Sequence, residues 1–320
     1  MNKYKNKKLH ILSSRTGGPL NQHLLLTEEL RKVGIVVKHY NDFWGWVKLH
    51  FIYGKNNYIL TNVPILFRFT ARNFFLSIHG NYKKERDIVK NPLAFLYGIN
   101  KIWSQEIIVP ANYLKTVLDI KNAIVIKNVL SEKIIRKGLE KKKYNTDHIN
   151  LIMVTMFGFR EKAQGVLRVI EILSGIKTRK EVTLNICGSG FFEEEVRERS
   201  EKYKLPSNIK FIFNGYEKNI HEKYKESDIF IYWSDLDVMP NVFLEAMAFG
   251  LPIITNNFPS FHEFLGEGSL IVKNKYEFIK ALEELINSSD KIKELGNKNR
   301  ETAKKYSPKN TVNDWMRLLE

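Results

Sequence analysis

The sequence has little cysteine and no long apolar run, and both scarcities limit what the protein can be. Cys187 is the single cysteine among 320 residues, so no intramolecular disulfide can form, which points to a reducing compartment. C-x-x-C and H-E-x-x-H patterns are missing, so the sequence does not suggest the common zinc sites. We expect neither a signal peptide nor a transmembrane helix, because no apolar stretch is long enough. These features favour a cytoplasmic protein.

Acidic residues are outnumbered by basic ones. The chain has 51 Lys and Arg against 35 Asp and Glu, a formal net charge of +16. This excess favours an anionic partner, such as a nucleoside diphosphate, an anionic lipid headgroup or a nucleic acid. The lysines are spread along the chain, which is also typical of an ordinary solvated surface. No RNP-like pattern, zinc finger or repeat is present, so we expect no nucleic-acid partner.

Short apolar runs alternate with helical stretches along the whole chain, which predicts an α/β protein with doubly wound parallel sheets. The strand candidates of the first half are 9–13, 35–39, 58–61, 74–78, 106–109 and 123–126. Those of the second half are 150–155, 183–187, 210–213, 228–232, 251–255 and 269–272. A lysine-rich linker at 137–148 separates the halves. The predicted domains are therefore 1–145 and 146–307, followed by a terminal helix at 308–320.

The segment at 228–255, DIFIYWSDLDVMPNVFLEAMAFGLPIIT, carries the strongest functional signal. An apolar strand leads into a polar turn and then into a helix at 241–249. Glu245 lies four residues after Asn241 and shares a face with the helix N-terminus, while Asp237 precedes that helix. Free helix N–H groups suit phosphate and carboxylates suit vicinal hydroxyls, so the crevice suits a sugar nucleotide.

This segment resembles the E-x7-E region of retaining GT-B glycosyltransferases, above all glycosyltransferase family 4. Asp237 stands where the family usually has glutamate, and Val238 where glycine is common. The positions that match the usual form are Ser234, Pro240, Val242, Leu244, Glu245, Ala246, Met247, Ala248, Gly250 and Pro252. The resemblance implies a GT-B fold, in which two Rossmann-like doubly wound domains face a central cleft. It also implies that the terminal helix packs back on the first domain.

The resemblance assigns roles around this helix. Glu245 is expected to bind the ribose hydroxyls of the donor, and Asp237 its sugar hydroxyls. The residues expected to approach the donor at the start of the helix are Val238, Met239, Pro240, Asn241 and Val242.

Further motifs of the resemblance lie in both halves. The Gly17-Gly18 loop precedes a helix in the way that a phosphate cradle requires, and His79 follows a strand in the family's place for a histidine against the transferred sugar. In the second half, Gly188 and Gly190 match a G-x-G turn near the nucleotide. The Gly215-Tyr216 pair resembles the turn under the base.

The segment MVTMFGFREKAQGV resembles the family's v-G-R-l-x-x-x-K-G segment, whose arginine and lysine pair with the donor phosphates. Lys162 fits the lysine position. The arginine position falls near Phe157, so we expect Arg160, placed in a loop, to supply the second cation.

These residues together predict a retaining, metal-independent hexosyltransferase that moves a sugar from a nucleotide-diphosphate donor to an acceptor hydroxyl in glycan, polysaccharide or glycolipid synthesis. The donor is a substrate, and no further cofactor is expected. One alternative is a non-catalytic nucleotide-sugar-binding or scaffold protein on a degenerate GT-B fold. Another is a GT-A enzyme, because Asp235 and Asp237 form a D-x-D that could hold a divalent ion.

Residues 42–55, DFWGWVKLHFIYGK, mix tryptophans and other rings with cations, and the basic run at 3–8 belongs to the same predicted domain. Such a composition favours peripheral contact with the inner membrane face and a lipid-linked acceptor. The alternative is that these rings complete the domain core or line the acceptor cleft.

Overall fold

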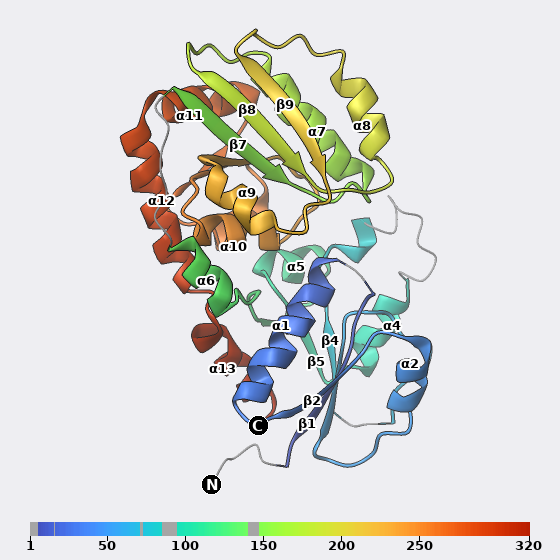
Figure 1. The fold of residues 1–320 in the computed structure, drawn as a ribbon. Coiled ribbons are helices and arrows are strands. Elements are labelled where there is room, and N and C mark those ends of the chain that lie inside the picture. The colour runs from blue at the N-terminus through green and yellow to red at the C-terminus, as the bar shows by residue number, and fades with distance from the viewer. Residues whose placement is uncertain (1–5, 16, 71–72, 85–94, 140–146) are drawn as a thin grey trace. The chain divides into compact units, whose positions relative to one another are not determined.

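The computed structural model describes residues 6–15, 17–70, 73–84, 95–139 and 147–320 (Figure 1). The chain forms two compact units, Met1–Ser131 with Tyr306–Glu320, and Glu132–Lys305. The boundary comes earlier than the predicted linker, part of which lies outside the described residues. The reason is helix α6 (Glu132–Gly138), which packs on the second unit, where Arg300 Nε donates to the Gly138 carbonyl at 3.1 Å.

The first unit is built on a parallel sheet with strand order β2-β1-β3-β4-β5-β6. The strands are β1 (Lys8–Leu12), β2 (Val36–Tyr40), β3 (Asn57–Thr61), β4 (Asn73–Ser77), β5 (Glu106–Val109) and β6 (Ile124–Val125). The described helices are α1 (Gly18–Lys32), α2 (Phe43–Leu49), α4 (Leu96–Trp103), α5 (Asn112–Val117) and α13 (Pro308–Leu318). Strand β1 sits between β2 and β3, with Lys8 opposite Val36 and Asn57.

Helix α13 is the last helix of the chain, yet it belongs to the first unit. It lies beside α1, and Val312 and Trp315 join the core cluster that contains Leu9 and Ile11 of β1. The Tyr58 hydroxyl of β3 also donates to the Leu319 carbonyl at 3.2 Å. Burial of these apolar side chains attaches the chain terminus to this sheet.

The second unit contains a parallel sheet with strand order β12-β11-β10-β7-β8-β9. Its strands are β7 (His148–Val154), β8 (Glu181–Cys187), β9 (Ile209–Gly215), β10 (Ile229–Tyr232), β11 (Ile253–Asn256) and β12 (Ser269–Val272). Besides α6, its helices are α7 (Arg160–Leu173), α8 (Glu193–Ser200), α9 (Ile220–Glu226), α10 (Asn241–Ala248), the 3-10 helix η2 (Pro259–Glu263), α11 (Lys275–Asn287) and α12 (Ser289–Lys304). Every residue of β10 and β11 is buried, as expected for a sheet covered on both faces.

The twelve predicted strands all form among the described residues, and their ends differ from the predicted ends by two residues at most. Both sheets are parallel, as the alternation of strands and helices predicts. None of the described helices is long and apolar enough to span a bilayer.

Candidate functional site

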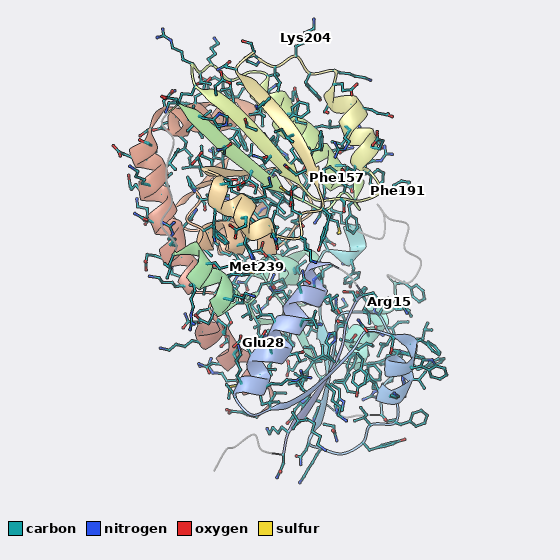
Figure 2. All side chains as sticks on the ribbon, viewed as in Figure 1. Arg15, Glu28, Phe157, Phe191, Lys204 and Met239 are labelled. Atoms are coloured by element: carbon teal, nitrogen blue, oxygen red, sulfur yellow. The ribbon has the colours of Figure 1, made fainter. Side chains whose placement is uncertain are left out.

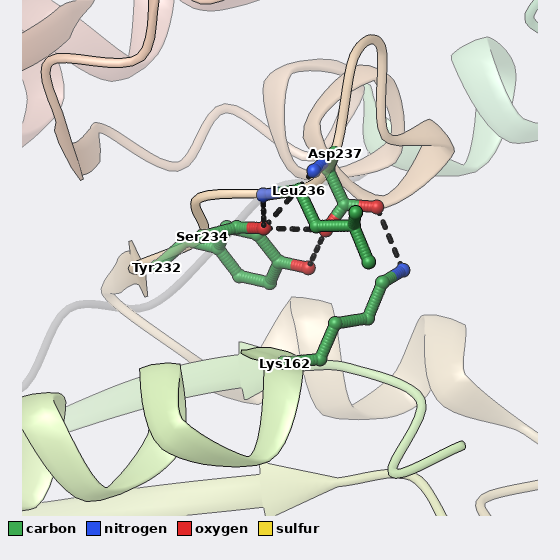
Figure 3. A network of polar contacts seen from close by, with 5 residues as sticks. All are labelled: Lys162, Tyr232, Ser234, Leu236 and Asp237. Carbon is green, nitrogen blue, oxygen red and sulfur yellow. Dashed lines mark hydrogen bonds and ion pairs between the residues drawn. The ribbon is translucent and has the colours of Figure 1, made fainter. Parts of the chain in front are cut away.

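An ion pair between Lys162 and Asp237 forms the centre of the candidate site in the second unit (Figure 3). Lys162 lies in the first turn of α7, just after the carboxyl end of β7, and Asp237 lies in the loop between β10 and α10. Lys162 Nζ is 2.7 Å from Asp237 Oδ1, and the two side chains are only 15% and 14% exposed. Neighbouring parallel strands end at the same edge of a sheet, which is why residues 75 positions apart meet here.

The second carboxylate oxygen of Asp237 is held by hydroxyl groups. Asp237 Oδ2 accepts hydrogen bonds from the Tyr232 hydroxyl at 2.7 Å and from Ser234 Oγ at 2.9 Å. Ser234 Oγ in turn accepts from the backbone N–H groups of Leu236 and Asp237 at 3.2 and 3.1 Å. The Ser234 backbone N–H donates to Asn256 Oδ1 on β11 at 2.9 Å. The orientation of the carboxylate is therefore fixed by the end of β10 and by its neighbour β11.

The Asp237 carboxylate is ionised at neutral pH. Burial raises the pKa of this carboxyl, but the attraction and hydrogen bond of Lys162, together with the hydrogen bonds from Tyr232 and Ser234, outweigh burial and leave the pKa below its ordinary value. Each carboxylate oxygen accepts two hydrogen bonds, so Oδ1 can accept one from a ligand hydroxyl beside that from Lys162. The ammonium group likewise carries donors beyond the one directed at Asp237.

Glu245 lies on α10 and has a partner that sequence reasoning missed. The hydroxyl of Tyr224, a fully buried side chain on α9, donates to Glu245 Oε2 at 3.1 Å. Burial raises the pKa of Glu245 to about 7 and raises the pKa of Tyr224 well above its usual value. A buried carboxyl poised to ionise near neutrality is a binding or catalytic candidate.

Two glycines of the predicted donor site are required by chain packing. A Cβ on Gly188, whose φ is +133°, would stand 1.7 Å from the Thr155 carbonyl oxygen, and a Cβ on Gly190 would stand 2.5 Å from the backbone of Phe157. The loops after β7 and β8 therefore pack directly on each other. Gly215 closes β9, its carbonyl accepts from Gly188 N–H at 2.7 Å, and the following Tyr216 is 78% exposed.

The second predicted cation, Arg160, stands in a different setting from the one expected. The structure places it at the first position of α7, where the sequence predicted a loop. Its guanidinium lies 3.4 Å from Glu195 Oε2 and 5.3 Å from the Phe192 ring centroid. Phe157, at the family's arginine position, is fully buried with its ring 6.4 Å from that of Phe213 (Figure 2 labels Phe157). The described contacts thus pair Lys162 with Asp237 and Arg160 with Glu195.

The residues before α10 form a rigid entry to the helix. Val238 and Met239 are buried, Pro240 occupies the N-cap position without a side-chain capping bond, and Asn241 and Val242 are the first helical residues. A proline at the helix entrance presets the backbone there. The N-terminus of α10 therefore projects next to the loop that holds Asp237.

In the first unit, the predicted residues lie at the carboxyl ends of β1 and β4. Gly17, at φ 90° and ψ −177°, is the N-cap of α1, and Gly18 begins the helix. This backbone conformation is open essentially to glycine alone, and Thr16 of the same loop lies outside the described residues. His79 Nε2 is 2.9 Å from Ser77 Oγ.

His79 has a buried histidine neighbour that the sequence did not single out. His23 of α1 is 1% exposed, and its ring meets that of His79 edge-on at 5.6 Å between centroids. Both rings line a cavity of about 20 Å³, large enough for one water molecule. Burial lowers the pKa of His79 to about 4 and that of His23 well below its usual value, so both are uncharged at neutral pH. His79 can therefore exchange hydrogen bonds with a hydroxyl but does not act as a cation.

Solved structures share this architecture. HepE of Anabaena in complex with UDP-glucose has a TM-score of 0.75 at 14% identity, covering 98% of this chain and 99% of that one. A glycosyltransferase of Rickettsia africae has a TM-score of 0.70 at 14% identity, covering 99% and 98%. At such identities the likeness shows the fold alone. Two Rossmann-like units with six-stranded parallel sheets define a protein of the GT-B class, which sets aside the GT-A alternative.

Sequence comparison identifies the family. The family model described as Glycosyl transferases group 1 matches residues 137–305, more than half of the chain, so the chain belongs to this family. An uncharacterized glycosyltransferase of Haemophilus influenzae is 28% identical over 159 residues, which are 48% of this chain and 44% of that protein. The match thus spans less than half the length of this curated relative.

Proposed function

We propose that this protein is a retaining glycosyltransferase that moves a sugar from a nucleoside diphosphate donor to an acceptor hydroxyl. The observation that carries the proposal is the ion pair of Lys162 and Asp237 at the carboxyl edge of the second sheet, 2.7 Å apart and largely buried. Membership of the Glycosyl transferases group 1 family supports it. The relatives known as glycosyltransferases and the likeness to HepE, solved with UDP-glucose, support the same substrate class.

The proposed transfer is a substitution at the anomeric carbon of the donor sugar. The bond between this carbon and the β-phosphate oxygen breaks, and a bond to the acceptor oxygen forms on the same face of the sugar. The acceptor proton passes to a phosphate oxygen of the departing nucleoside diphosphate, so no separate protein base is required. Lys162 stabilises the charge that develops on this leaving group, because its ammonium retains donors beyond the one that meets Asp237.

Asp237 serves two purposes in this proposal. It holds Lys162 in place through Oδ1, and the remaining lone pair of that oxygen accepts a hydroxyl of the transferred sugar. Tyr232 and Ser234 keep the carboxylate ionised and oriented. Positive charge for the diphosphate comes from Lys162 and from backbone N–H groups at the helix starts, so the reaction needs no divalent ion.

Glu245 binds the ribose of the donor in this proposal. A carboxylate can accept hydrogen bonds from both hydroxyls of a vicinal diol. The Tyr224 hydroxyl, which donates to Oε2, fixes the orientation of the Glu245 carboxylate. The exposed ring of Tyr216 offers a flat face to the base, and the neutral His79 offers a hydrogen bond to a sugar hydroxyl. The acceptor is a glycan or a lipid-linked glycan.

The proposal is tested first by binding and then by product analysis. Thermal melts of the full chain with UDP, GDP and ADP and with their glucose and galactose derivatives should select one nucleotide, because a ligand of the native state raises the melting temperature. With the selected donor and a panel of sugar acceptors, NMR of the product should show the anomeric configuration of the donor retained, and transfer should persist in EDTA. Inversion of the anomer would overturn the retaining assignment, and loss of transfer in EDTA would overturn metal independence.

One observation favours a second candidate. Phe157 is fully buried where the family carries a phosphate-binding arginine, which weakens the diphosphate site. A protein that binds nucleotide sugars without transferring them would fit this change. Such a protein would show the thermal shift with neither donor hydrolysis nor transfer.

A further inference from the structure

One side of the first unit exposes many large apolar side chains. Of the 18 large hydrophobic residues exposed in the described chain, nine lie between positions 43 and 102. They are Phe43, Trp44, Phe51, Tyr53, Leu66, Phe67, Phe95, Ile99 and Ile102, with exposures between 36% and 82%. Helix α2 carries Phe43 and Trp44 and helix α4 carries Ile99 and Ile102, and both helices lie on the side of the sheet away from α1 (Figure 1). These nine side chains are exposed and therefore do not complete the core of this unit. The sequence analysis had left core packing open for the rings at 42–55.

Contacts join several of the segments that carry these side chains. The ring centroids of Phe43 and Trp46 are 5.7 Å apart, and those of Trp46 and Phe67 are 6.4 Å apart, which joins α2 to the segment after β3. The same segment is tied to α4, because Ile65 N–H donates to Asn100 Oδ1 at 2.8 Å and Asn100 Nδ2 donates to the Ile65 carbonyl at 2.9 Å. We call these nine residues, with Trp46, the aromatic surface.

On α4 the exposed apolar residues follow a helical period. Phe95, Ile99 and Ile102 recur at spacings of four and three, which places them on one face, while Leu96 and Asn100 face the interior. An apolar stripe that is exposed to solvent on one face of a helix, as among the described residues of α4, indicates an interaction site.

The stretch of chain that carries the aromatic surface is basic in its described part. Lys48, Lys55 and Arg68 are exposed there, and the described residues between Phe43 and Ser104 include no aspartate or glutamate. The acidic residue just before this stretch, Asp42, is engaged as the N-cap of α2 and accepts from Gly45 N–H at 2.6 Å. A partner with apolar interior and negative surface complements this arrangement.

We propose that the aromatic surface docks on a lipid bilayer containing anionic headgroups. Tryptophan and tyrosine favour the boundary between headgroups and acyl chains, leucine, isoleucine and phenylalanine enter the acyl region, and the basic side chains contact lipid phosphates. Such docking would suit an acceptor that is anchored in the same bilayer. This last step rests on the proposed function, whereas docking itself does not.

Flotation with vesicles tests the docking without any enzymatic assay. The full chain should float with vesicles of phosphatidylglycerol and phosphatidylcholine, and much less with phosphatidylcholine alone or in high salt. Replacing Lys48 and Arg68 by serine should weaken binding to the anionic vesicles about 25-fold, since each cation near such a surface contributes roughly fivefold. The Trp44→Ser and Phe67→Ser double variant should weaken it about tenfold or more. Brominated lipids should quench tryptophan fluorescence of the wild type.

Two exposed apolar residues outside the aromatic surface provide the matched control. Leu24 of α1 is 48% exposed and Tyr276 of α11 is 76% exposed, so the Leu24→Ser and Tyr276→Ser double variant removes comparable apolar area elsewhere. It should float like the wild type. Thermal melts confirm that all variants fold.

Three outcomes overturn the proposal. The first is a wild type that fails to float with the anionic vesicles, and the second is equal loss in the control and surface variants. The third is self-association, seen by sedimentation equilibrium and abolished by Trp44→Ser with Phe67→Ser, which would assign the surface to a second copy of the chain. Donor binding in the same preparations separates failure of docking from failure of the proposed function.

Discussion

Removal of Lys162 tests how the candidate site is stabilised. At 2.7 Å and an effective dielectric constant of about 20, the attraction between Lys162 and Asp237 is about 6 kcal/mol, and desolvation of two largely buried charges offsets most of it. We expect a coupling free energy of about 2 kcal/mol from a double-mutant cycle of Lys162→Met, Asp237→Asn and the double variant, measured by urea unfolding at pH 7. The Lys275→Met variant, which breaks an exposed pair with Glu171, should cost less than about 1 kcal/mol.

The same cycle has a predicted pH dependence. In the wild type the pKa of Asp237 lies below its usual value of 3.8, so the pair stabilises the fold above about pH 4 and loses this effect as pH falls through the native pKa. Without Lys162, burial raises the pKa of Asp237, and protonation then relieves the unpaired charge. The stability difference between wild type and Lys162→Met should therefore shrink between pH 7 and pH 4. A coupling below about 0.5 kcal/mol, or a difference independent of pH, would refute the reasoning.

Four further predictions concern three residues, Glu245, Asp237 and Cys187. The folded protein holds the Glu245 proton more tightly than the unfolded chain does, so the free energy of unfolding falls as pH rises from about 4.5 to about 7. Because glutamine stays uncharged, Glu245→Gln should be more stable than the wild type by about 1–2 kcal/mol at pH 8.5. The same variant should bind the selected nucleotide about 1.5–3 kcal/mol more weakly in calorimetry, and unchanged affinity would remove Glu245 from the site. Asp237→Asn should lower sugar transfer more than it weakens binding of the free nucleoside diphosphate, which lacks the sugar hydroxyls, and equal losses would indicate a structural role. Burial raises the pKa of Cys187 to about 12, so this thiol should resist Ellman's reagent in the native protein and react on unfolding, whereas rapid native reaction would contradict its placement on β8.

Strands were the most predictable part of the fold. The run at 151–154, LIMV, is short, apolar and bounded by the polar residues Asn150 and Thr155, so local sequence alone defines it. Helix α2 was not predicted, because seven residues rich in tryptophan and interrupted by Gly45 lack a helical period. The Asp42 side chain, which accepts from the Gly45 N–H, was the available signal for its start.

The candidate site also contains residues that the sequence indicated and residues that it did not. Asp237, Glu245 and Lys162 were identified because they lie in segments with recognisable spacing. Tyr224 could not be found, since its hydroxyl reaches Glu245 from 21 positions away and most other residues of its helix are polar. His23 was missed for a similar reason, because its contact with His79 depends on the packing of α1 on the first sheet. Contacts between elements depend on tertiary packing, which periodicity does not encode.

Release of nucleoside diphosphate from the selected nucleotide sugar tests the central claim most directly. The wild type should release it faster than the uncatalysed rate, and Lys162→Met should be slower by about 10²–10³-fold at saturating donor, as for loss of one group that stabilises developing charge. Lys275→Met removes the exposed ion pair with Glu171 of α7 and should match the wild type. Equal rates for Lys162→Met and wild type, or no release from any donor that the protein binds, would contradict the account.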